Sequence, residues 1–358
     1  MLRFTMVFVR CAFLAAVLTA VAISLPGSRS GDAAFPGANG KIAFSSDRAF
    51  LGADIYTMNP DGSGVSSLTS GGGQVPAWSA DGTKIAFRDG SVAGDIWIMG
   101  AAGGGQTNLT NTPDGETDPG WSPDGAKIVF VRNGDIHVMN SDGTGQTNLT
   151  NTPDGEAGPD SSPDGTKIVF VRNGDIYVMN ANGTGQTNLT NTLDGEASPD
   201  WSPDGTKIVF VRNGDIYVMN AGGSGQAGLT NDPLLEEEPA WSPDGTKIAF
   251  TRGSFAPEVY VMNADGSGQT NISNNPGSSD RAPDWQPLPP AATPSPTPSP
   301  TPVPVGGIAG LAAGSPDPAA GVSDRSGSDR AGPIAAAVAA GAMALVAGGW
   351  YVTRRWRR

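Results

Sequence analysis

Residues 199–230 read PDWSPDGTKIVFVRNGDIYVMNAGGSGQAGLT, and this stretch decides the fold. The run from Lys207 to Val211 is apolar without alternation, which is typical of a strand buried on both faces. Asn213-Gly214 indicates a two-residue type I′ turn, because both residues tolerate positive φ angles. The sequence therefore predicts a hairpin whose second strand covers residues 215–220.

Two further strands flank this hairpin. In the following unit, a strand at residues 239–242 passes through a Pro-Asp-Gly turn into a strand at residues 247–251. After the hairpin, a Gly-rich turn leads to a short polar segment of the Gln-Thr-Asn-Leu-Thr type, which suits the outer edge of a sheet. Each unit is thus expected to hold four antiparallel strands, named A to D in chain order.

The unit recurs along the chain with a period near 40 residues. Segments 119–158 and 159–198 agree at 32 of 40 positions, and 51 Gly and 30 Pro among 358 residues favour many tight turns over long helices. The motif Lys-Ile-(Ala/Val)-Phe begins six times, at Lys41, Lys84, Lys127, Lys167, Lys207 and Lys247. Six units of several short strands predict an all-β, six-bladed β-propeller.

The position of strand A predicts how the ring closes. Five units open with a strand A, but the first Lys-Ile-Ala-Phe, at Lys41, has no such strand before it. The missing copy follows the sixth unit, where Ala-Pro-Asp-Trp-Gln-Pro occupies residues 282–287. We therefore expect this C-terminal strand to pair with residues 41–45 and to complete blade 1.

Segments such as PAWSPDGTKIAF (239–250) and EVYVMNADGSG (258–268) resemble the WD-like repeats of TolB-type β-propellers. Similar repeats occur in propeller domains of some serine peptidases and in an oligogalacturonate lyase. The resemblance covers residues 35–287 and implies a fold much more than an activity. Nothing in the chain resembles the N-terminal domain of TolB, so the role of TolB in the Tol complex is not expected.

The two ends of the chain are typical of targeting segments. Residues 1–34 combine early arginines with an apolar run at residues 11–25, which predicts a signal peptide. Residues 288–332 are rich in Pro, Thr and Ser and then in Gly and Ala, which predicts a disordered stalk. Residues 333–352 form an apolar span followed by a basic tail at 353–358, so we expect one transmembrane helix with the propeller outside the cytoplasm.

The inventory of reactive side chains argues against an enzyme. The chain has one Cys and one His, which excludes a Cys/His catalytic pair and Cys/His zinc sites. His137 occupies a strand C position that holds Tyr or Trp in the other units, so we interpret it as a packing ring. No Gly-x-Ser-x-Gly motif is present.

Charge is concentrated in the loops between strands D and A. With 22 Lys+Arg against 35 Asp+Glu the net charge is −13, which makes a nucleic-acid partner improbable. These loops and the B-to-C turns share one side of the ring, which we name the loop face. The carboxylates expected to form a binding surface there are Asp114, Glu116, Asp154, Glu156, Asp194, Glu196, Glu236 and Glu237. The alternative is that these carboxylates only keep a Gly-rich surface soluble.

These observations predict a non-enzymatic protein-binding or scaffold module displayed on the cell membrane. Its partner would be a protein or peptide of basic character, since the loop face is acidic. No cofactor is expected, although a cation such as Ca²⁺ at the acidic loops is an open alternative. A second alternative is a metal-dependent accessory or enzymatic domain that acts on cell-surface polysaccharide.

Overall fold

The computed structural model describes residues 34–49 and 52–289, and its regular secondary structure is entirely β-strand. The predicted signal peptide, stalk, transmembrane helix and basic tail lie outside the described residues, apart from Ala34, Leu288 and Pro289. Within the described ranges, no helix has the length and apolar character needed to cross a membrane.

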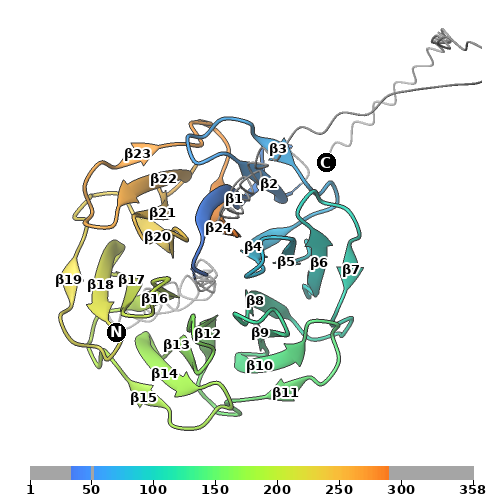
Figure 1. Ribbon diagram of the computed structural model, residues 1–358, viewed down its shortest axis with the longest axis vertical. Helices are drawn as coiled ribbons and strands as arrows, with labels where there is room; N and C mark the ends of the chain where they lie inside the picture. Colours follow the sequence, from blue (N-terminus) through green and yellow to red (C-terminus); the bar gives the residue numbers. More distant parts are fainter. Residues whose placement is uncertain (1–33, 50–51, 290–358) are drawn as a thin grey trace, which may run out of the picture. The chain divides into compact units, whose positions relative to one another are not determined.

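Six antiparallel sheets of four strands stand around a central channel as the blades of a propeller (Figure 1). The innermost strands (A) are β24 (Asp280–Leu288), β4 (Gln74–Trp78), β8 (Glu116–Trp121), β12 (Glu156–Ser161), β16 (Glu196–Trp201) and β20 (Glu236–Trp241). The second strands (B) are β1 (Ala38–Ser46), β5 (Lys84–Arg88), β9 (Lys127–Arg132), β13 (Lys167–Arg172), β17 (Lys207–Arg212) and β21 (Lys247–Arg252).

The outer half of each blade is a longer strand C and a very short strand D. The third strands (C) are β2 (Asp54–Met58), β6 (Ile96–Gly100), β10 (Asp135–Asn140), β14 (Asp175–Asn180), β18 (Asp215–Asn220) and β22 (Glu258–Asn263). The outermost strands (D) are β3 (Ser66–Ser67), β7 (Thr107–Asn108), β11 (Thr147–Asn148), β15 (Thr187–Asn188), β19 (Ala227–Gly228) and β23 (Thr270–Asn271). The prediction of an all-β, six-bladed propeller is confirmed.

Strand B carries the core because both of its faces are covered. In β17, Ile208 and Phe210 pack with Trp201 against blade 4, while Val209 and Val211 pack against Trp241 of blade 6. Each core cluster therefore lies between two blades and not inside one. This arrangement explains why strand B is apolar without alternation.

The two-residue turn between strands B and C forms as the sequence predicts. Asn213 and Gly214 have φ angles of 51° and 84°, and Arg212 pairs directly with Asp215 across the two-residue turn. Strand A is longer than expected, since β20 begins at Glu236 and not at Pro239. The reason is a β-bulge: the register shifts between Glu237 and Ala240, so strand pairing resumes on both sides of the proline.

This bulge recurs in all six inner strands at the residue before proline. The residues concerned are Val75, Asp118, Gly158, Ser198, Glu238 and Ala282, with φ angles between 51° and 57°. Because proline has no N–H group, a bulge there loses no ladder hydrogen bond. Five of the six are not glycine, so the channel wall holds strained backbone.

Blade 1 is closed by the C-terminal strand, as predicted. In β24, Trp285 pairs with Ile42 of β1 and is buried in the cluster between blades 6 and 1. The Asp284 carboxylate accepts a hydrogen bond of 2.6 Å from the Trp78 amide of blade 2. The last strand of the fold therefore joins the first blade to both of its neighbours.

The first described residues cross the channel on the face opposite the loop face. Phe35 is buried with Ala77 and Trp121 of blades 2 and 3. Ala34 packs in the cluster of Trp241, and its amide donates to the Trp201 carbonyl at 3.4 Å. Because these contacts lie on opposite sides of the ring, the segment spans the channel at the end where strands A finish.

Removing β24 should destabilise the whole ring. We expect a chain truncated after Ser279 to lose its cooperative unfolding transition or to unfold at a much lower temperature, since burial of Trp285 alone is worth about 4 kcal/mol. Thermal unfolding followed by circular dichroism measures this effect. Truncation after Pro294, which keeps β24, is the control, and equal transitions in both chains would contradict the closure.

Candidate functional site

The two faces of the ring differ in their exposed apolar side chains. The described large apolar residues that are exposed on the loop face are Val92, Leu193, Leu234, Leu235 and Phe255. They lie in B-to-C loops of blades 2 and 6 and in the D-to-A loops that precede blades 5 and 6. The longest B-to-C loops occur in blades 1, 2 and 6, where the two-residue turn of blades 3 to 5 is replaced. The loop face is therefore irregular on one side of the ring.

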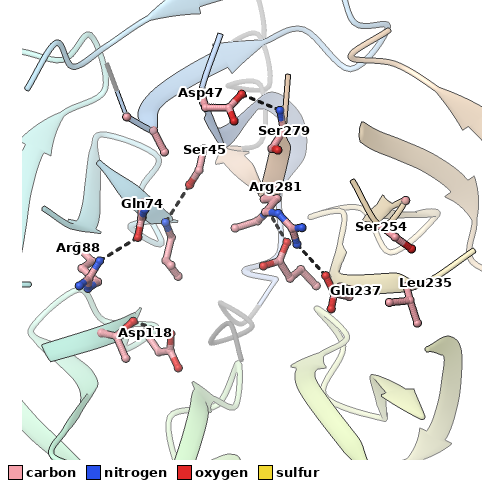
Figure 2. A pocket seen from close by; sticks show the side chains of 17 residues that line it. Ser45, Asp47, Gln74, Arg88, Asp118, Leu235, Glu237, Ser254, Ser279 and Arg281 are labelled. Atoms are coloured by element: carbon pink, nitrogen blue, oxygen red, sulfur yellow. Dashed lines mark hydrogen bonds and ion pairs between the residues drawn. The ribbon is translucent and has the colours of Figure 1, made fainter. Parts of the chain in front are cut away.

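A cavity of about 930 Å³ opens on this irregular side. We name it the mouth pocket, and Figure 2 shows it between blades 1, 2, 3 and 6. The charged residues that line it are Asp47, Arg88, Asp118, Glu237, Glu238 and Arg281. Four carboxyl groups and two guanidinium groups thus line the pocket, so acidic groups outnumber basic ones.

Most of the polar groups of the pocket already have partners. Arg281 forms an ion pair with Glu237 at 2.8 Å, and the Asp47 carboxylate accepts the Ser279 amide at 2.7 Å. The Glu238 carboxylate accepts the Ala282 amide at 2.6 Å, so it joins blade 6 to blade 1. Asp118 does the same for blades 3 and 4, by accepting the Gly158 amide at 3.2 Å.

Four of the eight predicted site residues are buried instead of facing the solvent. Glu116, Glu156, Glu196 and Glu236 are the first residues of their inner strands, and their side chains have no solvent exposure. Each is paired with the arginine at the end of strand B in its own blade: Arg132, Arg172, Arg212 and Arg252. They hold the blade together and cannot meet a partner directly.

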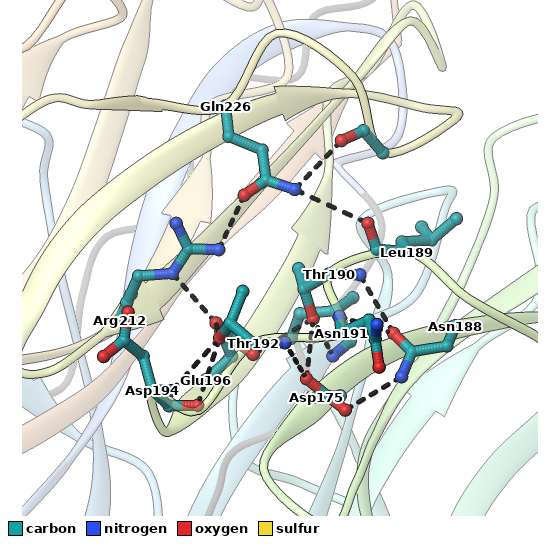
Figure 3. Close-up of polar contacts among 12 residues, drawn as sticks. Asp175, Asn188, Leu189, Thr190, Asn191, Thr192, Asp194, Glu196, Arg212 and Gln226 are labelled. Carbon is teal, nitrogen blue, oxygen red and sulfur yellow. Dashed lines mark hydrogen bonds and ion pairs between the residues drawn. The ribbon is translucent and has the colours of Figure 1, made fainter.

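Blade 5 shows how this ion pair fixes the loop (Figure 3). Glu196 accepts hydrogen bonds from Arg212 Nε at 2.8 Å and from the Thr192 hydroxyl at 2.6 Å. Asp175 accepts Asn188 Nδ2 at 2.8 Å and the Thr192 amide at 2.9 Å. The D-to-A loop is therefore held at both ends by buried or half-buried carboxylates. Asn188, the start of an Asn-Leu-Thr sequence, has a structural role in this network.

The other predicted residues remain at the surface but are not gathered into one site. Asp154 and Asp194 are exposed and Asp114 is half-buried, and none of them lines the mouth pocket. Glu237 is the predicted residue that does line it. Asp47, Arg88 and Arg281 are not among the predicted residues. Asp47 lies in an irregular loop, and Arg88 stands at the repeat position of arginines that are paired within their own blades.

His137 packs as a ring in the outer half of blade 3. Its imidazole lies 5.5 Å from the Phe130 ring, while Phe170 and Tyr177 of blade 4 are 5.6 Å apart in the same tilted arrangement. Burial, and then the charge of the nearby Arg132, hold the pKa of His137 below its ordinary value of 6.5. The ring is therefore neutral at pH 7.

The carboxylates of the described residues do not gather into a metal site. These residues contain no group of three or more His, Cys, Asp and Glu side chains that could hold a metal ion. In the Asp-Gly-Thr-Gly turn of blade 3, Asp142 accepts the Thr144 amide at 2.9 Å and its hydroxyl at 2.6 Å. This carboxylate stabilises the C-to-D turn.

Comparison with known proteins agrees with this architecture. A family model of the TolB beta propeller domain matches residues 74–175, and one of the dipeptidyl peptidase IV N-terminal region matches residues 194–254. No curated protein matches the chain in sequence.

Three solved structures illustrate the similarity. TolB from Acinetobacter baumannii has 22% identity and a TM-score of 0.60, covering 69% of this chain and 67% of its own. A putative TolB from Agrobacterium tumefaciens has 20% identity and a TM-score of 0.52, covering 70% of this chain and 99% of its own. A chain of a nidogen/laminin complex has 14% identity and a TM-score of 0.57, and the match covers 69% of this chain and 98% of that one. At these identities the likeness shows the fold, a TolB-like propeller.

The buried and exposed carboxylates of one loop should differ sharply in their effect on stability. We expect Glu196→Gln to lower the free energy of unfolding by about 3 kcal/mol, because it leaves the Arg212 guanidinium without its buried counter-charge. Asp194→Asn, two residues away and exposed, should change it by less than about 0.5 kcal/mol. Denaturant unfolding of both variants measures the difference, and equal effects would contradict the structural role of Glu196.

The lowered pKa of His137 should make stability depend on pH. Since the folded-state pKa lies below 6.5, the unfolded chain binds the proton more tightly, and this contribution to stability is lost as pH falls below about 6.5. We expect His137→Tyr to unfold at a higher temperature than the parent chain, with a gap that widens from about pH 7 to pH 5. The reverse change in blade 4, Tyr177→His, should introduce the same pH dependence. A constant gap would contradict this assignment.

Proposed function

We propose that this TolB-like propeller is a non-enzymatic binding module that holds a protein or peptide segment of basic character in the mouth pocket. The observation that carries the proposal is the coincidence of three features on one side of one face. The pocket, its excess of carboxylates and the exposed apolar side chains of Leu234, Leu235 and Phe255 all belong to the loop face.

The dimensions and chemistry of the pocket suit a short stretch of chain. A volume of about 930 Å³ is within the range of known ligand-binding pockets. Leu235 lines the pocket, and Phe255 follows the lining residue Ser254 in the same loop. Apolar side chains at the rim give a partner area to bury, while the carboxylates attract lysine or arginine.

The described residues offer recognition groups and no catalytic pair at this site. The single histidine of the chain lies on β10 and does not line the mouth pocket. The lining carboxylates Glu238 and Asp118 accept backbone amides of neighbouring blades and thereby stabilise the ring. A rigid ring with irregular loops on one face is an arrangement well suited to binding.

We also propose that the propeller is displayed outside the cytoplasm on a membrane. This proposal rests on the signal peptide predicted at residues 1–34 and the transmembrane helix predicted at residues 333–352. A partner would then be another protein of the cell envelope or of the surroundings. Fractionation of cells that express the full chain, with protease added from outside, tests the placement.

Selection of short random peptides against the full chain should enrich sequences that combine Lys or Arg with large apolar residues. Binding should weaken as salt rises, because charges at a partly exposed site are screened. A chelator should leave binding unchanged, in contrast to the metal-dependent alternative. Enrichment of acidic peptides would contradict the proposal.

Matched variants locate the site. Asp47→Asn with Glu237→Gln removes two charges from the mouth pocket and keeps the hydrogen-bond acceptors, and we expect it to weaken the selected peptides about tenfold or more. Asp154→Asn with Asp194→Asn removes two charges from the same face outside the pocket and should have little effect. Equal losses would place binding on the loop face as a whole.

A further inference from the structure

One blade lacks the ion pair on which the other five are built. In each of these five blades, an arginine at or after the end of strand B is paired with a carboxylate at the start of strand A, at 2.5 to 2.8 Å. The pairs are Arg48–Asp280, Arg132–Glu116, Arg172–Glu156, Arg212–Glu196 and Arg252–Glu236. In blade 2 the arginine is kept as Arg88, but the facing residue is the neutral Gln74.

Arg88 also departs from the others in its placement. The five paired arginines lie over the phenylalanine of their blade, 5.1 to 5.3 Å from the ring centre. Arg88 instead lies against Gly94 in the long B-to-C loop, where a Cβ atom would sit only 2.2 Å from Arg88 Nε. The glycine thus makes room for a guanidinium that lines the mouth pocket.

Arg88 forms no ion pair with any described residue. Its guanidinium donates to Gln74 Oε1 at 2.8 Å and to the Ser91 carbonyl at 3.3 Å, which occupies two of five N–H groups. Among the described residues, no carboxylate oxygen lies within the 4.0 Å of an ion pair with it. The adjacent loop, Ser70 to Gly73, carries no charge. In the loop that follows Arg88, the Asp89 carboxylate accepts the Ser91 hydroxyl at 2.8 Å and the Asp95 carboxylate accepts Asn108 Nδ2 at 2.9 Å.

A half-buried guanidinium without a counter-charge costs free energy, and one substitution would remove that cost. Gln74 faces Arg88 in the same register in which Glu116 faces Arg132. A glutamate at position 74 would therefore restore the ion pair of the other blades. The pocket instead has a cationic side at blade 2 and acidic residues at blade 6 (Figure 2).

We propose that Arg88 is an anchor for a carboxylate of the bound segment. The partner then supplies the carboxylate that faces the strand B arginine in the other five blades and that blade 2 lacks. The carboxylate is that of a chain terminus or of an Asp or Glu side chain. This inference rests on the proposed function and refines it: the segment in the mouth pocket is dipolar, with a carboxylate at Arg88 and basic groups toward Glu237 and Asp47. Bidentate pairing with a carboxylate is the interaction to which a guanidinium is best suited.

The reactivity of individual arginines in the full chain tests this anchor without a known partner. Phenylglyoxal modifies accessible, unpaired guanidinium groups, and mass spectrometry of the digested chain reports each arginine separately. We expect Arg88 to react faster than Arg132 and Arg212, which serve as internal controls. N-acetylglycine, which has a terminal carboxylate, or N-acetylglutamic acid α-amide, which has only a side-chain carboxylate, should protect Arg88 saturably.

The uncharged N-acetylglycinamide should not protect Arg88 at the same concentration. Stronger protection by one of the two carboxylate probes identifies the source of the carboxylate in the partner. Protection by neither probe, or equal protection by the amide, overturns the anchor.

Gln74→Glu is the decisive variant because it should strengthen the fold while removing the site. We expect it to slow modification of Arg88 to the rate of Arg132, to abolish protection by both probes, and to weaken carboxylate-containing peptides selected on the parent chain about tenfold or more. Arg88→Gln should weaken the same peptides with Gln74 unchanged. If peptides bind the parent chain and both variants equally, Arg88 is not the anchor, while the proposed binding function is supported. If no peptide binds but the probes protect Arg88, the carboxylate site at Arg88 is supported and the proposed binding function is wrong.

Discussion

The ring depends on the burial of strand B on both faces. A single blade cannot cover Ile208 and Phe210 on one side and Val209 and Val211 on the other, so each blade is stable only between two neighbours. The blade that ends the chain must meet the blade that begins it. This is the reason that β24 completes blade 1, since an open interface would expose the apolar faces of both end blades.

The same close packing determines which hydrogen-bond partners the buried polar groups have. The inner strands of neighbouring blades do not pair with one another through backbone hydrogen bonds. Side-chain carboxylates accept hydrogen bonds from backbone amides across the blade interfaces instead. Asp160, Asp200 and Asp284 each accept the amide of the tryptophan in the next blade, at 2.9, 2.6 and 2.6 Å. Many carboxylates of the described residues therefore have a structural role inside the ring, and the mouth pocket forms where the blades depart from the repeat.

The sequence alone is enough to predict the number of blades, the closing strand and the type I′ turns, because each follows from a local pattern. Strand C was predicted to the residue at 215–220. The role of Glu196 was not predictable, because its partner Arg212 lies 16 residues away and only the bulged register of strand A brings the two together. A count of loop charges gives no information on which carboxylates are already paired.

The segment at Ala34 and Phe35 makes the two ends of the channel different. Ala34 and Phe35 pack into blade interfaces on opposite sides of the ring, so they narrow the channel at the end away from the loop face. A segment held in the mouth pocket therefore meets packed residues at the far end of the channel, and the loop face is its direct route in and out.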